Sequence, residues 1–357
     1  MKTSFLTISL LVLAIWANAK VLTVSNDPNQ PAMYTTFSDA YKTAITGDTL
    51  YLVGSSTTYQ MVDIGKGISV IGSGFNNANE RQLETKITDF TLSFHQDDFG
   101  NIISSSSGSK IEGIQCENIY FSASDLIQIS NIEIKNCNLT RIFLTKVQSI
   151  SIHNCIINYA IYASGLSTAY VENLSVKNNI IGGYMRACYS HNSSTVIANN
   201  LFLNYLTPFD DMKGANIYNN VFCYETTFHR GFSNCIMSKN ISTGTQELNI
   251  SDYDNNVYGE NNLINTDPLF KNTPKMNAIN YSYDYRLQDS SPGKNAGTDG
   301  KDIGITGGDY PWPLNEGGML DFTGRPSLPY IEKMKILNSV VPTNGTLNVS
   351  VTVKSQN

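Results

Sequence analysis

The sequence has few tryptophans and histidines, little charge and no excess of positive charge. It contains two Trp and four His in 357 residues, and charged residues make up 15%. A soluble domain usually has roughly 25% charged residues, and this low content excludes a disordered chain or a coiled coil. The 24 Lys and Arg are outnumbered by 30 Asp and Glu, giving a net charge of −6. With no basic surface to hold a phosphate backbone, nucleic acid is excluded as a partner.

The apolar run near the N-terminus is too short to cross a membrane. It extends from Phe5 to Trp16, about 12 residues, whereas a spanning helix needs roughly 20. Lys2 precedes this run, and Ala17-Asn18-Ala19 follows it as a cleavage site of small residues. We therefore expect residues 1–19 to be a cleaved signal peptide. The mature protein would have no membrane span and would be periplasmic, secreted or located at the cell surface.

The cysteines lack the spacing of a metal site. No C-x-x-C motif occurs, and no cluster of Cys and His residues has zinc-binding spacing. An exported chain with six Cys could carry disulfides, but these residues are spread through a chain long enough to build a large core without them. We therefore expect buried thiols at all six positions: Cys116, Cys137, Cys155, Cys188, Cys223 and Cys235.

Asparagine, by contrast, is abundant, with 40 copies, and a short phrase built around it recurs through the middle of the chain. The copies are IQCENIYF (114–121), IEIKNCNL (132–139), ISIHNCII (150–157), LSVKNNII (174–181), TVIANNLF (195–202), ANIYNNVF (215–222) and CIMSKNIS (235–242). Aligned on the second Asn of the phrase, they give a column with spacings of 18 to 24 residues: Asn118, Cys137, Cys155, Asn179, Asn200, Asn220 and Asn240. Two residues later, six copies carry an apolar or aromatic side chain: Tyr120, Leu139, Ile157, Ile181, Phe202 and Phe222.

This period predicts a solenoid of parallel strands. It is too short for a strand-helix-strand unit, which needs 30 or more residues. Each copy is therefore one coil, and the coils stack about 4.8 Å apart so that equivalent side chains lie over one another. At the bend between strands, Asn tolerates left-handed backbone geometry and its amide can bridge to the next Asn of the column. We expect an all-β solenoid of about ten such coils.

These residues resemble the right-handed parallel β-helix proteins of the pectin-lyase-like superfamily. The resemblance extends to the opening segments VLTVSNDP (21–28), FSDAYKTAITGDTLYLVG (37–54) and ISVIGSG (68–74). At the other end it includes NTDPLF (265–270), YRLQDSSPGKNAG (285–297) and DIG (302–304), which are similar to the closing segment of secreted bacterial members. The resemblance implies export and contact with extracellular carbohydrate. It leaves the chemistry open, because relatives include polysaccharide lyases, hydrolases and proteins without demonstrated activity.

The chain is expected to divide into a signal peptide, a β-helix domain over residues 20–310 and an extension over residues 311–357. A short helix with Phe37, Tyr41 and Ala44 on one face, capped by Thr36 or Ser38, would cover the open first coil. The extension contains two alternating segments, 331–337 and 346–353, which predict a hairpin. This hairpin is either a docking tag or an additional cover for the end of the solenoid.

Ionisable residues gather on one side of the coils between residues 179 and 235. Ten residues after the Asn column come Tyr189, Asp210 and Arg230, which should stack in three consecutive coils. Around this stack lie five further polar residues: Arg186, His191, Asp211, Lys213 and His229.

Elimination from a uronic-acid polymer needs a cation at the sugar carboxylate, a base for the proton beside it and an acid for the leaving oxygen. Arg230 or Lys213 could supply the cation. The base would be His229 or His191, and the acid Tyr189. The alternative interpretation is a solvated turn with incidental ion pairs between coils, which contribute little.

Two adjacent carboxylates suggest a calcium ion in place of the cation. Asp210 and Asp211 could hold it, provided that the chain bends there, because neighbours on a regular strand point to opposite faces. Pro208 favours such a bend. Arg186 and Asp252 would then border the site as substrate-binding residues, and Asp252 is also the nearby carboxylate that glycoside hydrolysis would need as a partner. The polygalacturonase segments NTD, DD and GHG are out of order or altered here, and RIK is absent.

The residues therefore favour a secreted β-helix protein that binds or acts on extracellular polysaccharide. Because no complete catalytic set matches, binding is the first interpretation. A lyase that cleaves a uronic-acid polymer by β-elimination, with calcium as its candidate cofactor, is the second, and a structural or adhesive surface protein is the third. Nothing in the sequence indicates the oligomeric state.

Overall fold

The computed structural model describes most of the chain after the predicted signal peptide. The described residues are 19–76, 83–123, 127–163, 171–188, 194–203, 207–223, 229–244, 256–258, 261–274, 278–326, 330–338, 340–341 and 343–354. Residues 229–230, 257–258, 330–334 and 354 are described by their backbone alone. The predicted signal peptide therefore lies outside the described residues except for Ala19.

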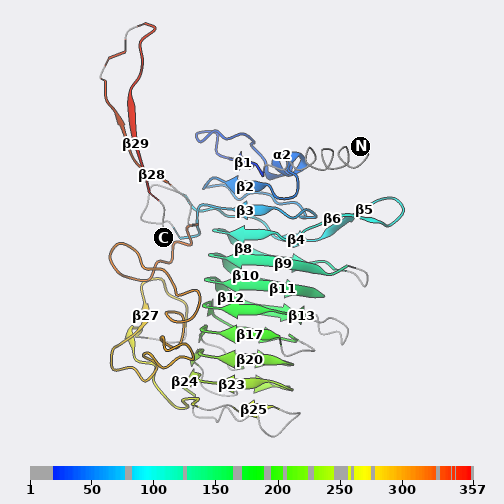
Figure 1. The fold of residues 1–357 in the computed structure, drawn as a ribbon, viewed down its shortest axis with the longest axis vertical. Coiled ribbons are helices and arrows are strands. Elements are labelled where there is room, and N and C mark those ends of the chain that lie inside the picture. Colours follow the sequence, from blue (N-terminus) through cyan, green and yellow to red (C-terminus); the bar gives the residue numbers. More distant parts are fainter. Residues whose placement is uncertain are drawn as a thin grey trace, which may run out of the picture.

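The first sheet has twelve strands, and its neighbours are parallel. Eleven form one continuous path (Figure 1): β1 (Val21–Val24), β2 (Thr49–Leu52), β3 (Ser69–Ile71), β7 (Lys110–Glu112), β9 (Ile129–Lys135), β11 (Val147–His153), β14 (Ser175–Lys177), β17 (Thr195–Ala198), β20 (Ala215–Tyr218), β23 (Ile236–Ser238) and β25 (Val257–Tyr258). The twelfth, β13 (Val171–Glu172), pairs with β11. The order follows the chain, as expected for a solenoid that adds one strand per coil.

The second sheet has eleven strands and divides into two branches after its long central strand. Its undivided part contains β4 (Phe90–Leu92), β8 (Gln115–Phe121), β10 (Asn138–Leu144) and β12 (Ile156–Ala163). One branch continues through β15 (Ile180–Ile181), β18 (Leu201–Leu203), β21 (Val221–Cys223) and β24 (Ile241–Ser242). The other contains β16 (Tyr184–Arg186), β19 (Phe209–Asp210) and β22 (His229–Arg230).

Together the sheets form the predicted right-handed parallel β-helix class, with about 8 turns rather than the expected ten and only 3% helix. In the described residues β1 and β2 add layers to the first sheet without a named partner strand in the second. The core lies between the sheets and consists of stacked aliphatic columns. One column, which ends in two aromatic rings, is Cys116, Leu139, Ile157, Ile181, Phe202 and Phe222.

The predicted column is confirmed from Cys137 onward, because Asn138 pairs with Ile156, and it extends one coil further than predicted. The Asn179 Oδ1 accepts a hydrogen bond from the Cys155 N–H at 2.9 Å, and Asn200 does the same for the Asn179 N–H. The series continues through Asn220 and Asn240 and ends at Asn262, which the alignment missed. Each amide thereby links one coil to the next.

The placement of Asn118 in this column is wrong. The register pairs Gln115 with Asn138, so Ile114, not Asn118, lies in the coil position next to Cys137. The alignment in this coil is therefore shifted by four residues. For the same reason Cys116, not Tyr120, faces the core beside Leu139.

The left-handed geometry belongs to the residue before the column. Asn178, Asn199 and Asn219 have φ of 54°, 56° and 57°. Their side chains point away from the ladder and bind the chain's closing segment, as the Asn178 Nδ2 does at the carbonyl oxygens of Ile305 and Gly307 at 3.1 and 2.7 Å. The two residues of each Asn pair therefore have separate roles.

Helix α2 (Phe37–Thr43) covers the first coil as predicted. The Thr36 side chain caps it by accepting the Asp39 N–H at 3.2 Å. Phe37, Ala40 and Tyr41 are buried in the core with the strands beneath them.

The closing segment runs along one side of the solenoid, over the Asn bends (Figure 1). It begins with the antiparallel pair β26 (Phe270–Asn272) and β27 (Asp284–Leu287). A second buried cluster joins its Ile305, Trp312 and Phe322 to outward residues of the solenoid, so burial continues beyond residue 310.

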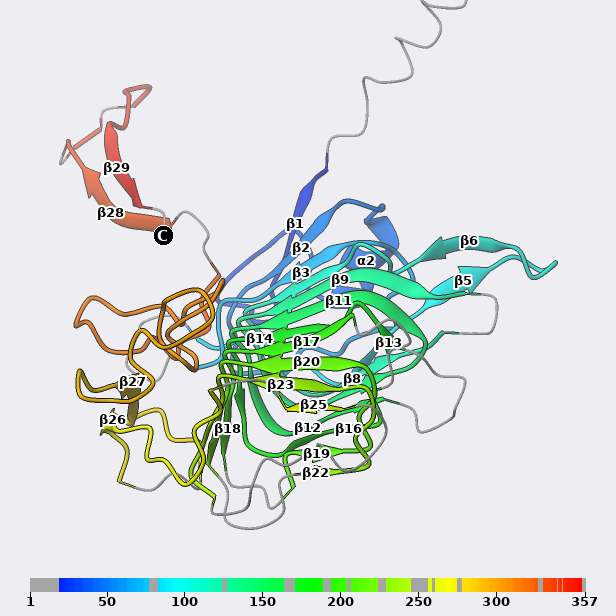
Figure 2. The ribbon, with the colours of Figure 1, turned by 60° about the horizontal axis from the view of Figure 1, so that its bottom comes forward.

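Two antiparallel hairpins project from the solenoid (Figure 2). One is formed by β5 (Phe94–Gln96) and β6 (Ile102–Ser105). The other is the predicted C-terminal hairpin, β28 (Tyr330–Ile336) with β29 (Val349–Lys354).

All six cysteines are buried thiols rather than disulfides, as expected from their spacing. Within the described residues, no helix has the length and hydrophobicity needed to span a bilayer.

Candidate functional site

A column of register partners crosses the second sheet and joins aromatic to charged residues. Its members are register partners on six consecutive strands: Tyr120, Phe143, Tyr162, Arg186, Asp210 and Arg230. The residues on either side of Tyr120, Phe143 and Tyr162 along their strands are mostly buried in the core. This alternation places the rings of Tyr120, Phe143 and Tyr162 on the outside of the solenoid.

The charged half of this column contains part of the predicted site. Asp210 and Arg230 are register partners, as the spacing predicted, but the partner of Asp210 in the preceding coil is Arg186, not Tyr189. The prediction for Tyr189 was shifted by three residues because the coils differ in length. Tyr189 itself, His191 and Asp252 lie outside the described residues.

The remaining predicted residues are placed in part. β22 pairs His229 with the buried Phe209, and it pairs Arg230 with Asp210. The side chains of His229 and Arg230 are outside the described atoms. The structure therefore supplies the register of these two residues, and their predicted roles as base and cation stay predictions.

The bend predicted beside Asp210 is present. Asp211 has a φ of 62°, so the chain turns directly after Asp210 and leaves Asp211 exposed. Lys213 is exposed on the same turn. Arg186 forms an ion pair with Asp210, with 3.3 Å between Nε and Oδ2. No group of three or more His, Cys, Asp or Glu side chains among the described residues is arranged to hold a metal ion.

The aromatic half of the column is a regular stack. The ring centroids of Tyr120 and Phe143 are 4.9 Å apart with 8° between the planes, and those of Phe143 and Tyr162 are 5.2 Å apart with 11°. Parallel rings at these centroid distances are offset, because full overlap would bring them closer. The offset leaves part of each ring uncovered, and Tyr120 at the end of the stack is 38% exposed.

Further aromatic groups extend this surface. The Tyr162 and Tyr184 hydroxyls are 2.8 Å apart, and the Arg141 guanidinium lies over the Tyr159 ring at 4.6 Å. Burial, followed by the contact with Tyr162, raises the pKa of Tyr184, so this phenol stays protonated at neutral pH.

A polar groove of about 610 Å³ lies on the first half of β8, β10 and β12, next to the aromatic stack. Amides, hydroxyls and carboxylates dominate its lining: Thr58, Lys86, Ile87, Thr88, Asp89, Gln115, Cys116, Glu117, Asn138, Thr140 and Asn158.

Hydrogen bonds hold the floor of the polar groove in place. The Asn158 Nδ2 donates to the Asn138 Oδ1 at 2.6 Å, and the Asn138 Nδ2 donates to the Tyr281 hydroxyl at 2.9 Å. Asp89 accepts the Asn118 N–H at 2.8 Å and its Nδ2 at 2.7 Å. A ligand would therefore meet a preorganised surface.

Cys116 lines the groove, but its thiol faces the core and does not act as a nucleophile. Burial, followed by the charge of Asp89, raises the pKa of Cys116 far above its ordinary value. The thiolate needed for nucleophilic attack is therefore not formed near neutral pH.

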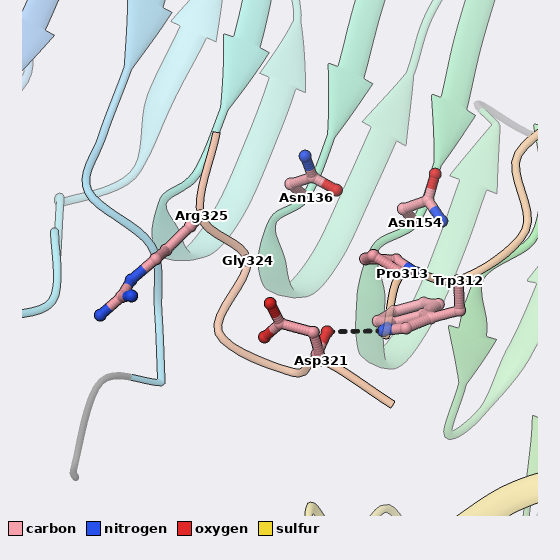
Figure 3. Close-up of a pocket in the computed structure, with 7 residues that line it drawn as sticks. All are labelled: Asn136, Asn154, Trp312, Pro313, Asp321, Gly324 and Arg325. Atoms are coloured by element: carbon pink, nitrogen blue, oxygen red, sulfur yellow. Dashed lines mark hydrogen bonds between the residues drawn. The ribbon is translucent and has the colours of Figure 1, made fainter. Parts of the chain in front are cut away.

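A second, smaller cavity lies under the closing segment and is shown in Figure 3. Its volume is about 20 Å³, enough for a single water molecule. Trp312 closes it and donates its Nε1–H to the Asp321 carbonyl at 2.8 Å. This cavity belongs to the packing of the closing segment rather than to a ligand site.

The polar groove and the aromatic stack were not predicted from the sequence. The signal was present as aromatic residues that recur within or a few residues after successive copies. The four-residue shift in the first copy placed Tyr120 in the core column and concealed the pattern.

Compared with known protein families and with curated proteins, the chain matches none.

Proposed function

We propose that this chain is a secreted β-helix protein, similar to the pectin-lyase-like superfamily, that binds extracellular polysaccharide on the outer face of its second sheet. One observation carries the proposal: the aromatic stack, the charged half of the same column and the polar groove all lie on this face. The apolar signal-like segment at residues 1–19 supports export.

The aromatic stack suits the chemistry of a sugar chain. Sugar rings present apolar C–H faces that pack against aromatic rings, and aromatic contacts supply much of the binding energy at such surfaces. Successive strands of the sheet are about 4.8 Å apart, close to the length of one sugar unit in an extended chain. A polysaccharide lying along the solenoid axis would therefore meet one equivalent side chain per unit.

The polar groove supplies the directional contacts that the stack cannot. Binding sites combine apolar surface with a few well-placed polar groups that fix orientation. Glu117 and Thr140 line the groove. They lie on β8 and β10, the strands that also carry Tyr120 and Phe143. One ligand can therefore contact both parts of this face.

Affinity electrophoresis through gels containing single polysaccharides tests this proposal. The panel would include pectate, methyl-esterified pectin, alginate, xylan, galactan and a glycosaminoglycan. The double variant Tyr120→Ala, Phe143→Ala is expected to lose about tenfold in affinity for the polymer that retards the native protein. Phe99→Ala is the matched control, because Phe99 is an aromatic residue 90% exposed on the β5–β6 hairpin, away from the stack. Equal binding by the double variant would contradict the proposed site.

Cleavage by β-elimination is the second proposal, and it is supported by the succession Arg186, Asp210 and Arg230 in the same column. A cation in this position could neutralise the carboxylate of a uronic acid. Elimination creates an unsaturated sugar that absorbs in the ultraviolet, so incubation with the acidic polymers of the panel detects it directly. Retardation without a rise in absorbance identifies a binding protein. If the protein neither binds nor cleaves any polymer, a structural or adhesive role replaces both proposals.

A further inference from the structure

The polar groove differs in charge from the rest of the proposed binding face. Two carboxylates, Asp89 and Glu117, belong to its lining, against a single cation, Lys86. Lys86 is already paired with Glu84, with 3.0 Å between Nζ and Oε2. The local balance is therefore negative. The Arg141 guanidinium lies over the Tyr159 ring and is not part of the lining.

The groups at the rim of the polar groove are available for a ligand. Among the described residues, the side chains of Gln115, Glu117 and Thr140 make no hydrogen bond or ion pair. Glu117 is exposed, and the other two are half-buried. The rim thus offers a carboxylate that accepts hydrogen bonds, an amide that both donates and accepts, and a hydroxyl. The floor beneath them is fixed by Asn138 and Asn158.

These groups match adjacent hydroxyls on a sugar. A carboxylate can accept two hydrogen bonds from neighbouring hydroxyl groups, and such charge-assisted bonds are the stronger kind. The same carboxylate repels a uronic acid, because two negative charges held close together interact unfavourably. A volume of about 610 Å³ is within the usual range of small-molecule sites.

We propose that the polar groove binds a neutral, hydroxyl-rich sugar unit and discriminates against a uronic acid. This inference rests on the proposed function, because it assigns a sugar class to one part of the same face. Glu117 and Thr140 act as specificity-determining residues: Glu117 accepts hydrogen bonds from sugar hydroxyls, and Thr140 exchanges a hydrogen bond with them.

Calorimetric titration with oligosaccharides of defined length tests the assignment. The probes are the neutral hexasaccharides of xylan, galactan, mannan and cellulose, together with the acidic hexamer of galacturonate. The native protein is expected to bind at least one neutral hexamer more tightly than the acidic one. Glu117→Gln should weaken neutral binding about tenfold, because it removes a charge-assisted hydrogen bond. It should not weaken, and is expected to strengthen, binding of the acidic hexamer.

Two further variants separate specificity from folding. Thr140→Val keeps the shape of the side chain and removes its hydroxyl. It should therefore lower the affinity for the neutral hexamer and leave the affinity for the acidic hexamer unchanged. Glu316→Gln is the matched control, because Glu316 is an exposed carboxylate of the closing segment, outside the groove. Thermal melting of each variant checks that the fold is retained.

The outcomes distinguish the two proposals. If the native protein binds through Tyr120 and Phe143 but Glu117→Gln and Thr140→Val change nothing, the groove assignment is wrong and the proposed function stands. Preference for the galacturonate hexamer also overturns the assignment. If no probe and no polymer binds, both proposals fail.

Discussion

The two asparagines of each pair stabilise the bend by different means. Asn199 adopts the left-handed conformation and binds the closing segment, whereas Asn200 forms the ladder inside. The Asn200 Oδ1 accepts the Asn179 N–H at 2.9 Å, and its Nδ2 donates to the Val176 carbonyl at 2.8 Å. These groups are buried, so removing the Asn200 amide leaves the Asn179 N–H and the Val176 carbonyl without this hydrogen-bond partner.

Asn200→Ala is therefore expected to lower the free energy of unfolding by about 3 kcal/mol, since it orphans several buried polar groups at once. Urea unfolding followed by circular dichroism measures this change. Asn29→Ala, at an exposed position before the first helix, should have little effect. A loss at Asn200 no larger than at Asn29 would contradict the role assigned to the ladder.

The ionisation of Asp284 supports the closing segment. Arg286 donates to both of its oxygens, from Nε at 2.8 Å and from Nη2 at 2.6 Å. Burial raises the pKa of Asp284, but the hydrogen bonds from Arg286 outweigh this effect and hold the pKa below its ordinary value of 3.8. The pair therefore stabilises the fold above that pH, and the contribution disappears as the pH falls through the lowered pKa.

Asp284→Asn should reduce stability near neutral pH by about 2 kcal/mol, and the difference from the native protein should shrink near pH 3. Unfolding in urea at the two pH values measures both effects. The control is Asp299→Asn, whose exposed pair with Lys301 at 3.7 Å should contribute little. A loss of the same size at both pH values would show that the charge of Asp284 is not the cause.

At the scale of the elements, the repeated phrase predicted the strands of the middle coils but not the register of the first. Asn179, Asn200 and Asn220 occur in copies of similar length, so counting residues was sufficient to align them. In the first copy, Asn118 belongs to a phrase of similar composition. The strand β8 nevertheless pairs with β10 through Gln115 and Asn138, which leaves Asn118 outside the column. Residue spacing alone cannot determine which of two similar alignments buries the better column.

A bulge in β12 creates the division of the second sheet. One residue of β10, Thr140, faces two of β12, Asn158 and Tyr159. In the next coil Gly182 and Gly183 take the same positions, between β15 and β16. A Cβ on Gly183 would lie 1.7 Å from the Tyr159 carbonyl oxygen. Only glycine therefore allows the backbone of this coil to approach the bulge.

Gly183→Ala should displace β16 and destabilise the protein by about 2 kcal/mol, because the clash is with backbone rather than with a flexible side chain. Thermal melting measures the loss. It should also weaken polysaccharide binding, since β16 carries Tyr184 and Arg186. Gly317→Ala is the control, because its nearest neighbour is the side-chain oxygen of Asn315 at 3.3 Å. Unchanged melting of Gly183→Ala would contradict this explanation.

For the whole molecule, the period of the sequence was enough to predict the fold class, because stacking of equivalent residues is a property of the repeat itself. The candidate site was predicted only in part. Asp210 and Arg230 were predicted as neighbours because each follows a member of the Asn column at the same spacing. The aromatic stack and the polar groove depend instead on the bulge in β12 and on the shifted register of the first coil. Such features arise from pairing between coils and have no local signature.

The C-terminal hairpin is structurally separate from the solenoid. Within the described residues, neither buried cluster includes a residue after Phe322. Val349, Val351 and Val353 alternate along β29 and are all exposed. A two-stranded hairpin without a covering layer is marginally stable by itself, so it contributes little to the cooperative unfolding of the solenoid.

Removing residues 327–357 should therefore leave the main thermal transition of the purified protein unchanged. The contrasting variant is Trp312→Ala, which truncates a buried side chain of the closing segment and should cost about 3 to 5 kcal/mol. Calorimetry of the two variants beside the native protein separates the roles of the two segments. A large fall in the melting temperature on removing the hairpin would show that it covers the solenoid, the alternative that its sequence left open. An unchanged transition leaves the exposed valines for contacts outside this chain, as a docking tag requires.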